Sequence, residues 1–141
     1  MRTMKYLIML LGKQSDYDAM SGSPAPGEPA WTEKDIKAMF GHMGAINDDL
    51  AESGEMVDAQ GLTEPSQAKL VTAAKDGTPV VSDGPYGEAK EVLAGYWVVD
   101  CENIERATEI AARAYACPMP EGAPNYPVVV QPIGEVCGDE M

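Results

Sequence analysis

Residues 83–91 read DGPYGEAKE, and the rest of the chain is arranged around them. They follow a segment expected to form an antiparallel hairpin, and they precede a very apolar segment expected to form a strand. Pro85 lacks an amide hydrogen and has a fixed φ, so no regular strand can continue through it. The Asp83 side chain can accept hydrogen bonds from amides two residues further on, which stabilises a turn. The stretch therefore predicts a rigid turn between two strands.

The same nine residues concentrate charge, with three acidic side chains and one basic side chain. One interpretation is a site for small-molecule chemistry, with Asp83 and Glu88 as candidate acid and base groups. Tyr86, Lys90 and Glu91 would then be candidate ligand-binding residues. The alternative is a structural turn whose exposed ion pairs contribute little to stability. Ion-pair networks and catalytic sites look alike in sequence, so both interpretations stay open.

His42 is the only histidine, and it falls beside the apolar stripe of a predicted helix. Histidine often serves as a general base, so His42 is the third catalytic candidate. The alternative is a boundary histidine on a helix surface. Tyr6, on the first predicted strand, is a further ligand-binding candidate. A lone histidine without a second ligand type at metal spacing predicts no metal site, and no cofactor is expected.

The composition is that of one globular domain spanning residues 1–141. Ten Lys and Arg residues stand against 23 Asp and Glu residues, which gives a formal net charge of −13. Such a surface repels phosphate backbones and anionic lipids, so we expect neither nucleic acid nor membrane as a partner. The apolar run at residues 6–11 is too short for a membrane span or a signal-peptide core.

Three cysteines, Cys101, Cys117 and Cys137, are widely spaced and form no C-x-x-C pair. Their odd number and spacing predict neither a disulfide framework nor a structural zinc site. A reducing, cytoplasmic location fits this pattern. Thiol chemistry at Cys101 is a weaker idea, because no basic neighbour is evident that would favour the thiolate.

Hydrophobic periodicity and turn signals divide the chain into alternating strands and helices. Apolar residues at three- and four-residue spacing predict a helix over 32–53, with Thr32 as N-cap and Gly54 as the residue that ends it. Asp76-Gly77 predicts a hairpin over residues 68–82. The remaining expectations are a strand at 4–11, a long loop insertion at 13–31, a short edge strand at 55–59, a central strand at 95–101, a helix from Asn103 to Pro118, an edge strand at 127–133 and an acidic tail at 134–141.

This order is the β-α-β-β-α-β pattern of ferredoxin-like α+β domains, with an extra β-hairpin. Two helices would cover one face of the sheet, and no predicted element is left to cover the other. Its apolar side chains need a partner, and a second copy of the chain is the simplest one. We therefore expect a homodimer in which two sheets pack face to face.

Residues 83–91 closely resemble D-G-P-F-x-E-x-K-E, the signature of the DGPF subgroup of the YCII-related family. Residues 93–99 (LAGYWVV) resemble the family's L-G-G-Y strand, and residues 4–6 and 52–54 also fit. The sequence departs from the pattern at Tyr86, which replaces phenylalanine, at Arg106, which replaces an acid, and at Gln131, which replaces an arginine. The carboxylate-binding role that this arginine would have is therefore not expected here.

The resemblance implies a dimeric α+β barrel, a superfamily that includes isomerases, oxygenases and ligand-binding modules. It also implies two settings: enzymes using a His–Asp pair, and proteins associated with alternative sigma factors. The first hypothesis is therefore a small-molecule binder or enzyme with a cleft near residues 83–91, closed by a dimer partner. The alternative is a regulatory or interaction module without chemistry, whose acidic surface meets a basic partner.

Overall fold

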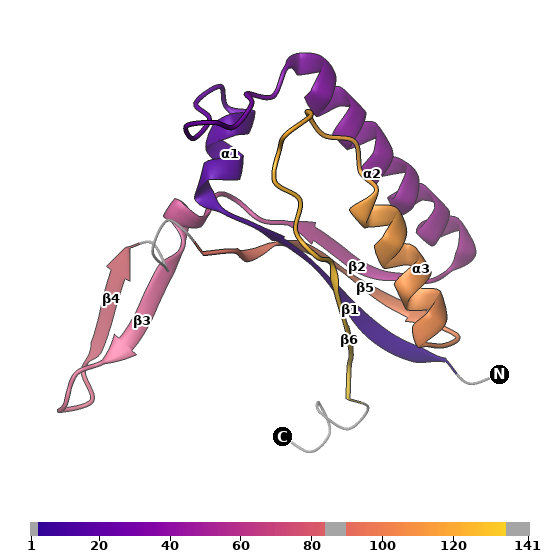
Figure 1. Cartoon of the computed structure of the whole chain (residues 1–141). Coiled ribbons are helices and arrows are strands. Elements are labelled where there is room, and N and C mark those ends of the chain that lie inside the picture. The colour runs from indigo at the N-terminus through magenta and orange to yellow at the C-terminus, as the bar shows by residue number, and fades with distance from the viewer. Residues whose placement is uncertain (1–2, 84–89, 135–141) are drawn as a thin grey trace.

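The computed structural model describes residues 3–83 and 90–134, and its elements follow the predicted order (Figure 1). Nothing is described for residues 84–89 or for the tail beyond residue 134, so the predictions made for Tyr86, Glu88 and the acidic tail lie outside the described residues. The elements are β1 (Met4–Gly12), α1 (Gln14–Met20), α2 (Glu33–Ser53), β2 (Met56–Gly61), the short 3-10 helix η1 (Pro65–Gln67), β3 (Lys69–Ala73), β4 (Pro79–Asp83), β5 (Val92–Cys101), α3 (Ile104–Tyr115) and β6 (Val129–Pro132).

The main sheet has four antiparallel strands in the order β2-β5-β1-β6. The predicted central strand, β5, pairs with both β1 and β2, and β6 lies at the edge, where its proline is tolerated. The strands β3 and β4 form a separate two-stranded hairpin. The order and the antiparallel pairing confirm the ferredoxin-like α+β fold, and the hairpin is its extra element.

Side chains alternate between the two faces of β5, as expected for a strand with one buried face. Trp97, Val99 and Cys101 are buried, whereas the intervening Tyr96 and Val98 are partly exposed. The buried face meets α2 and α3, which lie on the same side of the sheet (Figure 1). Ile46 and Leu50 of α2 and Ile110 of α3 complete this core together with other apolar side chains.

The helix ends are the ones that capping rules predict. The Thr32 hydroxyl accepts a hydrogen bond from the Asp35 amide, and Gly54 ends α2 in the left-handed conformation with φ 81°. The Asn103 side chain accepts from the Arg106 amide at the start of α3. Each bond satisfies a backbone group that the first or last turn of a helix leaves without a partner.

The prediction of a loop throughout residues 13–31 was wrong in its first part, where α1 spans Gln14–Met20. Seven residues are too few to show a helical period in sequence, and only residues 21–31 lack a helix or strand. The two glycines within α2, Gly41 and Gly44, do not mark a close backbone approach, since an added Cβ would meet no atom within 4 Å at either position. Across residues 3–83 and 90–134, no helix is both long and apolar enough to cross a membrane.

Candidate ligand-binding site

A cavity of about 520 Å³ lies on the helix-covered side of the sheet. Its lining comes from the ends of β1 and β5, from β2, from α1 and α2, and from the segment between α3 and β6 that arches back toward the sheet (Figure 1). Pockets of a few hundred cubic ångströms with apolar walls are the usual sites for small ligands. These elements are far apart in sequence, so only the tertiary fold assembles the site.

Aromatic residues dominate the lining. Of the eight aromatic residues that the structure describes, seven contribute to it. Two of them, Tyr17 and Trp31, fall in the segment 13–31 that was predicted as a loop, and Phe40 falls in the predicted helix over 32–53. Phe40 is in fact 65% exposed, so it does not belong to the core. The seven are Tyr17, Trp31, Phe40, Tyr96, Trp97, Tyr115 and Tyr126; the Tyr96 side chain, paired with Met9, lies on the face of the sheet away from the helices.

Hydrogen bonds hold several of these rings in place. The Tyr17 hydroxyl donates to the Leu62 carbonyl oxygen at 3.2 Å, which ties α1 to the end of β2. The Trp97 indole donates to the Asn47 side-chain oxygen at 2.6 Å, which links β5 to the middle of α2. Rings fixed by such bonds lose little freedom when a ligand binds, and this lowers the cost of association.

Asp16 supplies a carboxylate to the lining, and Tyr126 is hydrogen-bonded to it. The Asp16 carboxylate accepts from the Lys13 amide at 2.7 Å, which caps α1, and from the Tyr126 hydroxyl at 3.3 Å. The pKa of Tyr126 is raised well above its usual range, first by burial and then by its bond to Asp16 and by nearby carboxylates. Tyr126 is therefore a neutral hydrogen-bond donor at physiological pH.

The structure places the described residues of the charged turn outside this lining. Asp83 ends β4 on the hairpin, forms an ion pair with Lys69 and has a side chain that is 81% exposed. Lys90 and Glu91 are also exposed. The charge of Glu91 nevertheless contributes to the raised pKa of Tyr126, a residue of the lining.

The structure does not bring the catalytic candidate His42 or the ligand-binding candidate Tyr6 into the cavity either. His42 donates from Nε2 to the Arg113 carbonyl oxygen at 2.7 Å and thereby connects α2 to α3. Tyr6 lies in the hydrophobic core and is 3% exposed. Neither residue belongs to the lining of the cavity, and neither shares a hydrogen bond with Asp83 among the described residues.

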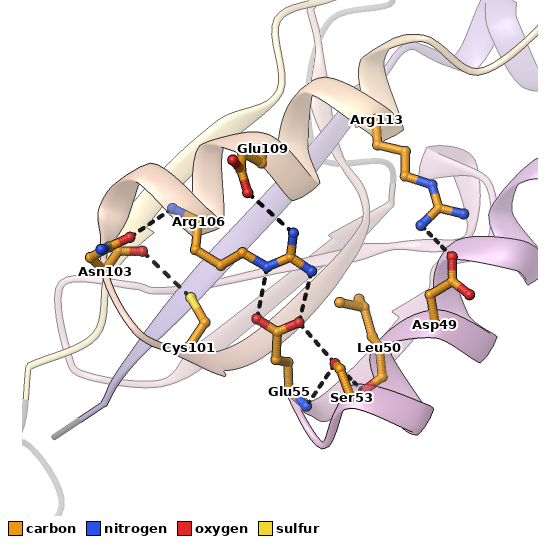
Figure 2. Close-up of polar contacts among 9 residues, drawn as sticks. All are labelled: Asp49, Leu50, Ser53, Glu55, Cys101, Asn103, Arg106, Glu109 and Arg113. Atoms are coloured by element: carbon orange, nitrogen blue, oxygen red, sulfur yellow. Dashed lines mark hydrogen bonds and ion pairs between the residues drawn. The ribbon is translucent and has the colours of Figure 1, made fainter. Parts of the chain in front are cut away.

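The densest group of polar contacts lies at the opposite end of α2 (Figure 2). Arg106 of α3 donates to both carboxylate oxygens of Glu55, at 2.9 and 2.8 Å, and to Glu109 at 3.2 Å. The bond from Arg106 is the main cause of a lowered pKa at Glu55. Each charge is committed to another, which is typical of a structural network rather than a binding site.

The two cysteines that the structure describes, Cys101 and Cys117, are both buried and unoxidised. Burial raises the pKa of the Cys101 thiol, and the Glu55 carboxylate raises it further, so the thiolate is disfavoured even with Arg106 nearby. Burial raises the pKa of Cys117 as well. Among residues 3–83 and 90–134, no three His, Cys, Asp or Glu side chains could hold a metal ion together.

The fold and the cavity first define a class: a small α+β protein whose antiparallel sheet carries a ligand-sized cavity beneath its helices. The family model of the YCII-related domain matches residues 4–129, and the chain belongs to this family. The match does not separate subgroups, so membership of the DGPF subgroup stays a prediction. An uncharacterized protein of Rhizobium meliloti (strain 1021) is 27% identical over 82 residues, which make up 58% of this chain and 65% of that protein. The chain thus spans less than two thirds of this relative's length.

Proposed function

We propose that this protein binds a small, largely apolar molecule in the cavity between the sheet, α1 and α2. The observation that carries the proposal is the concentration of aromatic side chains around one space of about 520 Å³. Aromatic rings that served only the core would be buried, but Phe40 and Tyr115 are 65% and 48% exposed and both belong to the lining. Exposed rings grouped at one opening favour a ligand site.

Binding, rather than acid–base catalysis, is the function that the geometry supports best. Asp83 is engaged with Lys69, and His42 with the Arg113 carbonyl oxygen. A general base must lie within hydrogen-bond reach of the proton that it removes, and neither group belongs to the cavity lining. The proposed site of the ligand is therefore the cavity, rather than the charged residues of the segment 83–91.

Tryptophan fluorescence offers a direct test, because Trp31 and Trp97 are the only tryptophans and both belong to the lining. Adamantyl methanol is a compact, neutral probe that does not absorb at the wavelengths used. We expect it to change the emission in a saturable manner, with one molecule bound per chain. The Ala123→Phe variant, which adds a ring to the lining, should abolish the change.

The matched control is Ala112→Phe, since Ala112 is an exposed residue of α3 outside the lining. This variant should bind the probe as the unmodified protein does. Absence of any saturable change in the unmodified protein would show that the cavity does not accept ligands of this kind. Equal binding by both variants would show that the probe binds at another surface.

The second candidate function, an interaction module without chemistry, is favoured by the hairpin β3–β4. Val71 and Val81 face each other across this hairpin and are 67% and 60% exposed. An exposed apolar pair on a projecting element suits contact with another protein. A regulatory role in a sigma-factor setting would use this hairpin or the acidic surface. A purified protein that captures no protein partner yet retains a bound metabolite would argue against it.

The uncovered face of the sheet supports the proposal of a homodimer. The helices lie on the other side (Figure 1), and strand register brings partly exposed apolar side chains together on the open side. These residues are Leu7, Met9, Val98 and Val129. A second copy that places the same face against this one buries all of them in a symmetric interface.

A further inference from the structure

The charge around the cavity is strongly one-sided. Among the residues that the structure describes, its lining contains no lysine, arginine or histidine, and Asp16 is its acidic side chain. A ligand carboxylate or phosphate inside this cavity would meet no cationic partner among the lining residues. Because burying an unpaired charge is costly, the lining disfavours anions before any contact is considered.

One lining residue, Tyr126, donates a hydrogen bond to the Asp16 carboxylate. The negative charges of Glu28 and Glu91, which lie outside the lining, also help to raise the pKa of Tyr126. One carboxylate oxygen of Glu28 is shielded from solvent and has no hydrogen-bond partner among the described residues. An unpartnered buried oxygen leaves its negative charge poorly compensated, and interactions in a low-dielectric interior act over longer range than in water.

A cation of the protein itself, the Lys13 ammonium, already lies near Tyr126. The Lys13 ammonium lies 5.9 Å from the centre of the Tyr126 ring, within the range of a cation–π contact. Lys13 supplies one positive charge, whereas three carboxylates act on Tyr126. The net charge of these four groups is therefore negative. The aromatic walls, including those of Tyr17 and Trp31, offer further ring faces to a second cation.

We propose that the cavity selects an amphipathic cation, namely an ammonium group carried on an apolar or aromatic body. The apolar body occupies the space among the rings, and the ammonium group lies toward Tyr126, where Asp16 supplies the carboxylate of the lining and Glu28 has a carboxylate oxygen without a hydrogen-bond partner among the described residues. This inference rests on the proposed binding function and adds the chemical class of the ligand. An inorganic cation does not fit, because apolar walls offer it too few oxygen ligands.

Three probes of nearly equal shape test the inference on the unmodified protein: adamantyl methylammonium, adamantyl methanol and adamantane carboxylate. Affinities are measured by tryptophan fluorescence and checked by calorimetry at low ionic strength and neutral pH. The ammonium probe should bind about tenfold more tightly than the alcohol, and the carboxylate should bind more weakly than the alcohol by a similar factor. Added salt should reduce the differences in affinity among the three probes.

The Glu28→Gln variant removes one charge and keeps the shape of the side chain. It should lower the ratio of ammonium to alcohol affinity about threefold while leaving the alcohol affinity unchanged. Glu52→Gln removes the same charge at the far end of α2 and should leave the ratio as it is. A second variant, Asp16→Asn, should lower the ratio as well, because Asp16 belongs to the lining.

The outcomes separate the inference from the binding proposal beneath it. Equal affinities for the ammonium and the alcohol would overturn the inference and leave the binding function standing. Preference for the carboxylate would overturn it as well. If no probe binds, the binding function fails and the inference fails with it. The three-probe comparison needs no variant, so a misfolded variant cannot obscure the answer.

Discussion

Arg106 joins three parts of the chain at the scale of a single residue. Its guanidinium group binds Glu55 through two hydrogen bonds and Glu109 through a third, and so fixes α3 to the segment between α2 and β2 (Figure 2). The Glu55 side chain is 16% exposed, so its carboxylate depends on this partner. The sequence showed only that Arg106 departs from the family pattern, because a pairing across 51 positions leaves no local signal.

Arg106→Leu should destabilise the fold by about 2 kcal/mol, since it leaves the Glu55 carboxylate partly buried without its partner. Arg113→Leu is the matched control on the same helix. The side chains of Arg113 and its partner Asp49 are 42% and 58% exposed. The variant should therefore lower the free energy of unfolding by less than about 1 kcal/mol. Urea unfolding measures the free energy of unfolding of both variants, provided that its dependence on urea concentration has the same slope in each. Equal losses of stability in the two variants would contradict the structural role assigned to Arg106.

The same pair predicts a dependence on pH. Because Arg106 lowers the pKa of Glu55 in the folded chain, its stabilisation is fully present above the pKa of an unfolded glutamate, about 4.3. It is lost as the pH falls through the lower folded pKa. The stability difference between the unmodified protein and Arg106→Leu should therefore shrink below about pH 4. A difference that stays constant from neutral to acidic pH would show that charge does not cause it.

Gly95 is a position where a methyl group does not fit. A Cβ there would lie 3.0 Å from the Gln60 carbonyl oxygen, which belongs to the neighbouring strand. Gly95→Ala should lower stability by about 1–3 kcal/mol, because the backbone of β2 must move. Gly44→Ala, where a Cβ meets nothing within 4 Å, should instead raise stability by up to about 1 kcal/mol. Opposite shifts of the urea midpoint are the expected result, and shifts of the same sign would contradict it.

At the scale of elements, the parts governed by local rules were predictable. Thr32, Asn103 and the Asp76-Gly77 turn all follow from capping and turn chemistry within a few residues, and the structure confirms them. The cavity was not predictable in this way. Its lining residues looked like core stripes or loop anchors, and only packing shows that they share one space. A high share of aromatic residues in the otherwise polar segments around Tyr17, Trp31 and Tyr126 was the available signal.

The hairpin β3–β4 gives a prediction at this scale. Its strands pair only with each other, and four of the five residues of β3 and all five of β4 are exposed. A two-stranded hairpin without a packed face is marginally stable. Its amide hydrogens should therefore exchange at least about 100-fold faster than those of β5, whose alternate side chains are buried. Hydrogen exchange followed by mass spectrometry measures this, and equal protection would mean that a partner covers the hairpin.

At the scale of the whole molecule, helices cover one face of the sheet, and none of the helices in residues 3–83 and 90–134 covers the other (Figure 1). The sequence predicted this asymmetry from the number of helices alone, and the structure bears out the ferredoxin-like arrangement behind it. The proposed ligand site and the proposed dimer interface lie on opposite faces of one sheet. A ligand bound beneath the helices would therefore leave contacts on the open face undisturbed.

The homodimer can be tested by sedimentation velocity. The unmodified protein should sediment at twice the chain mass of 15.0 kDa at micromolar concentrations. Val98→Lys, which places a charge on the open face opposite Leu7, should sediment as a monomer. Val71→Lys, on the exposed hairpin, is the matched control and should remain dimeric. If the unmodified protein sediments as a monomer, the proposal of a homodimer is wrong.

The most direct test of the cavity as the functional site uses isotope-labelled methionine methyl groups, read by NMR during titration with adamantyl methylammonium. Met20, Met39, Met43 and Met119 belong to the cavity lining, whereas Met9 lies on the open face of the sheet. The signals of those four methionines should shift together and saturate, while the signal of Met9 stays unchanged. A shift of Met9 without any change in the four lining methionines would place the ligand on the wrong face and contradict the account.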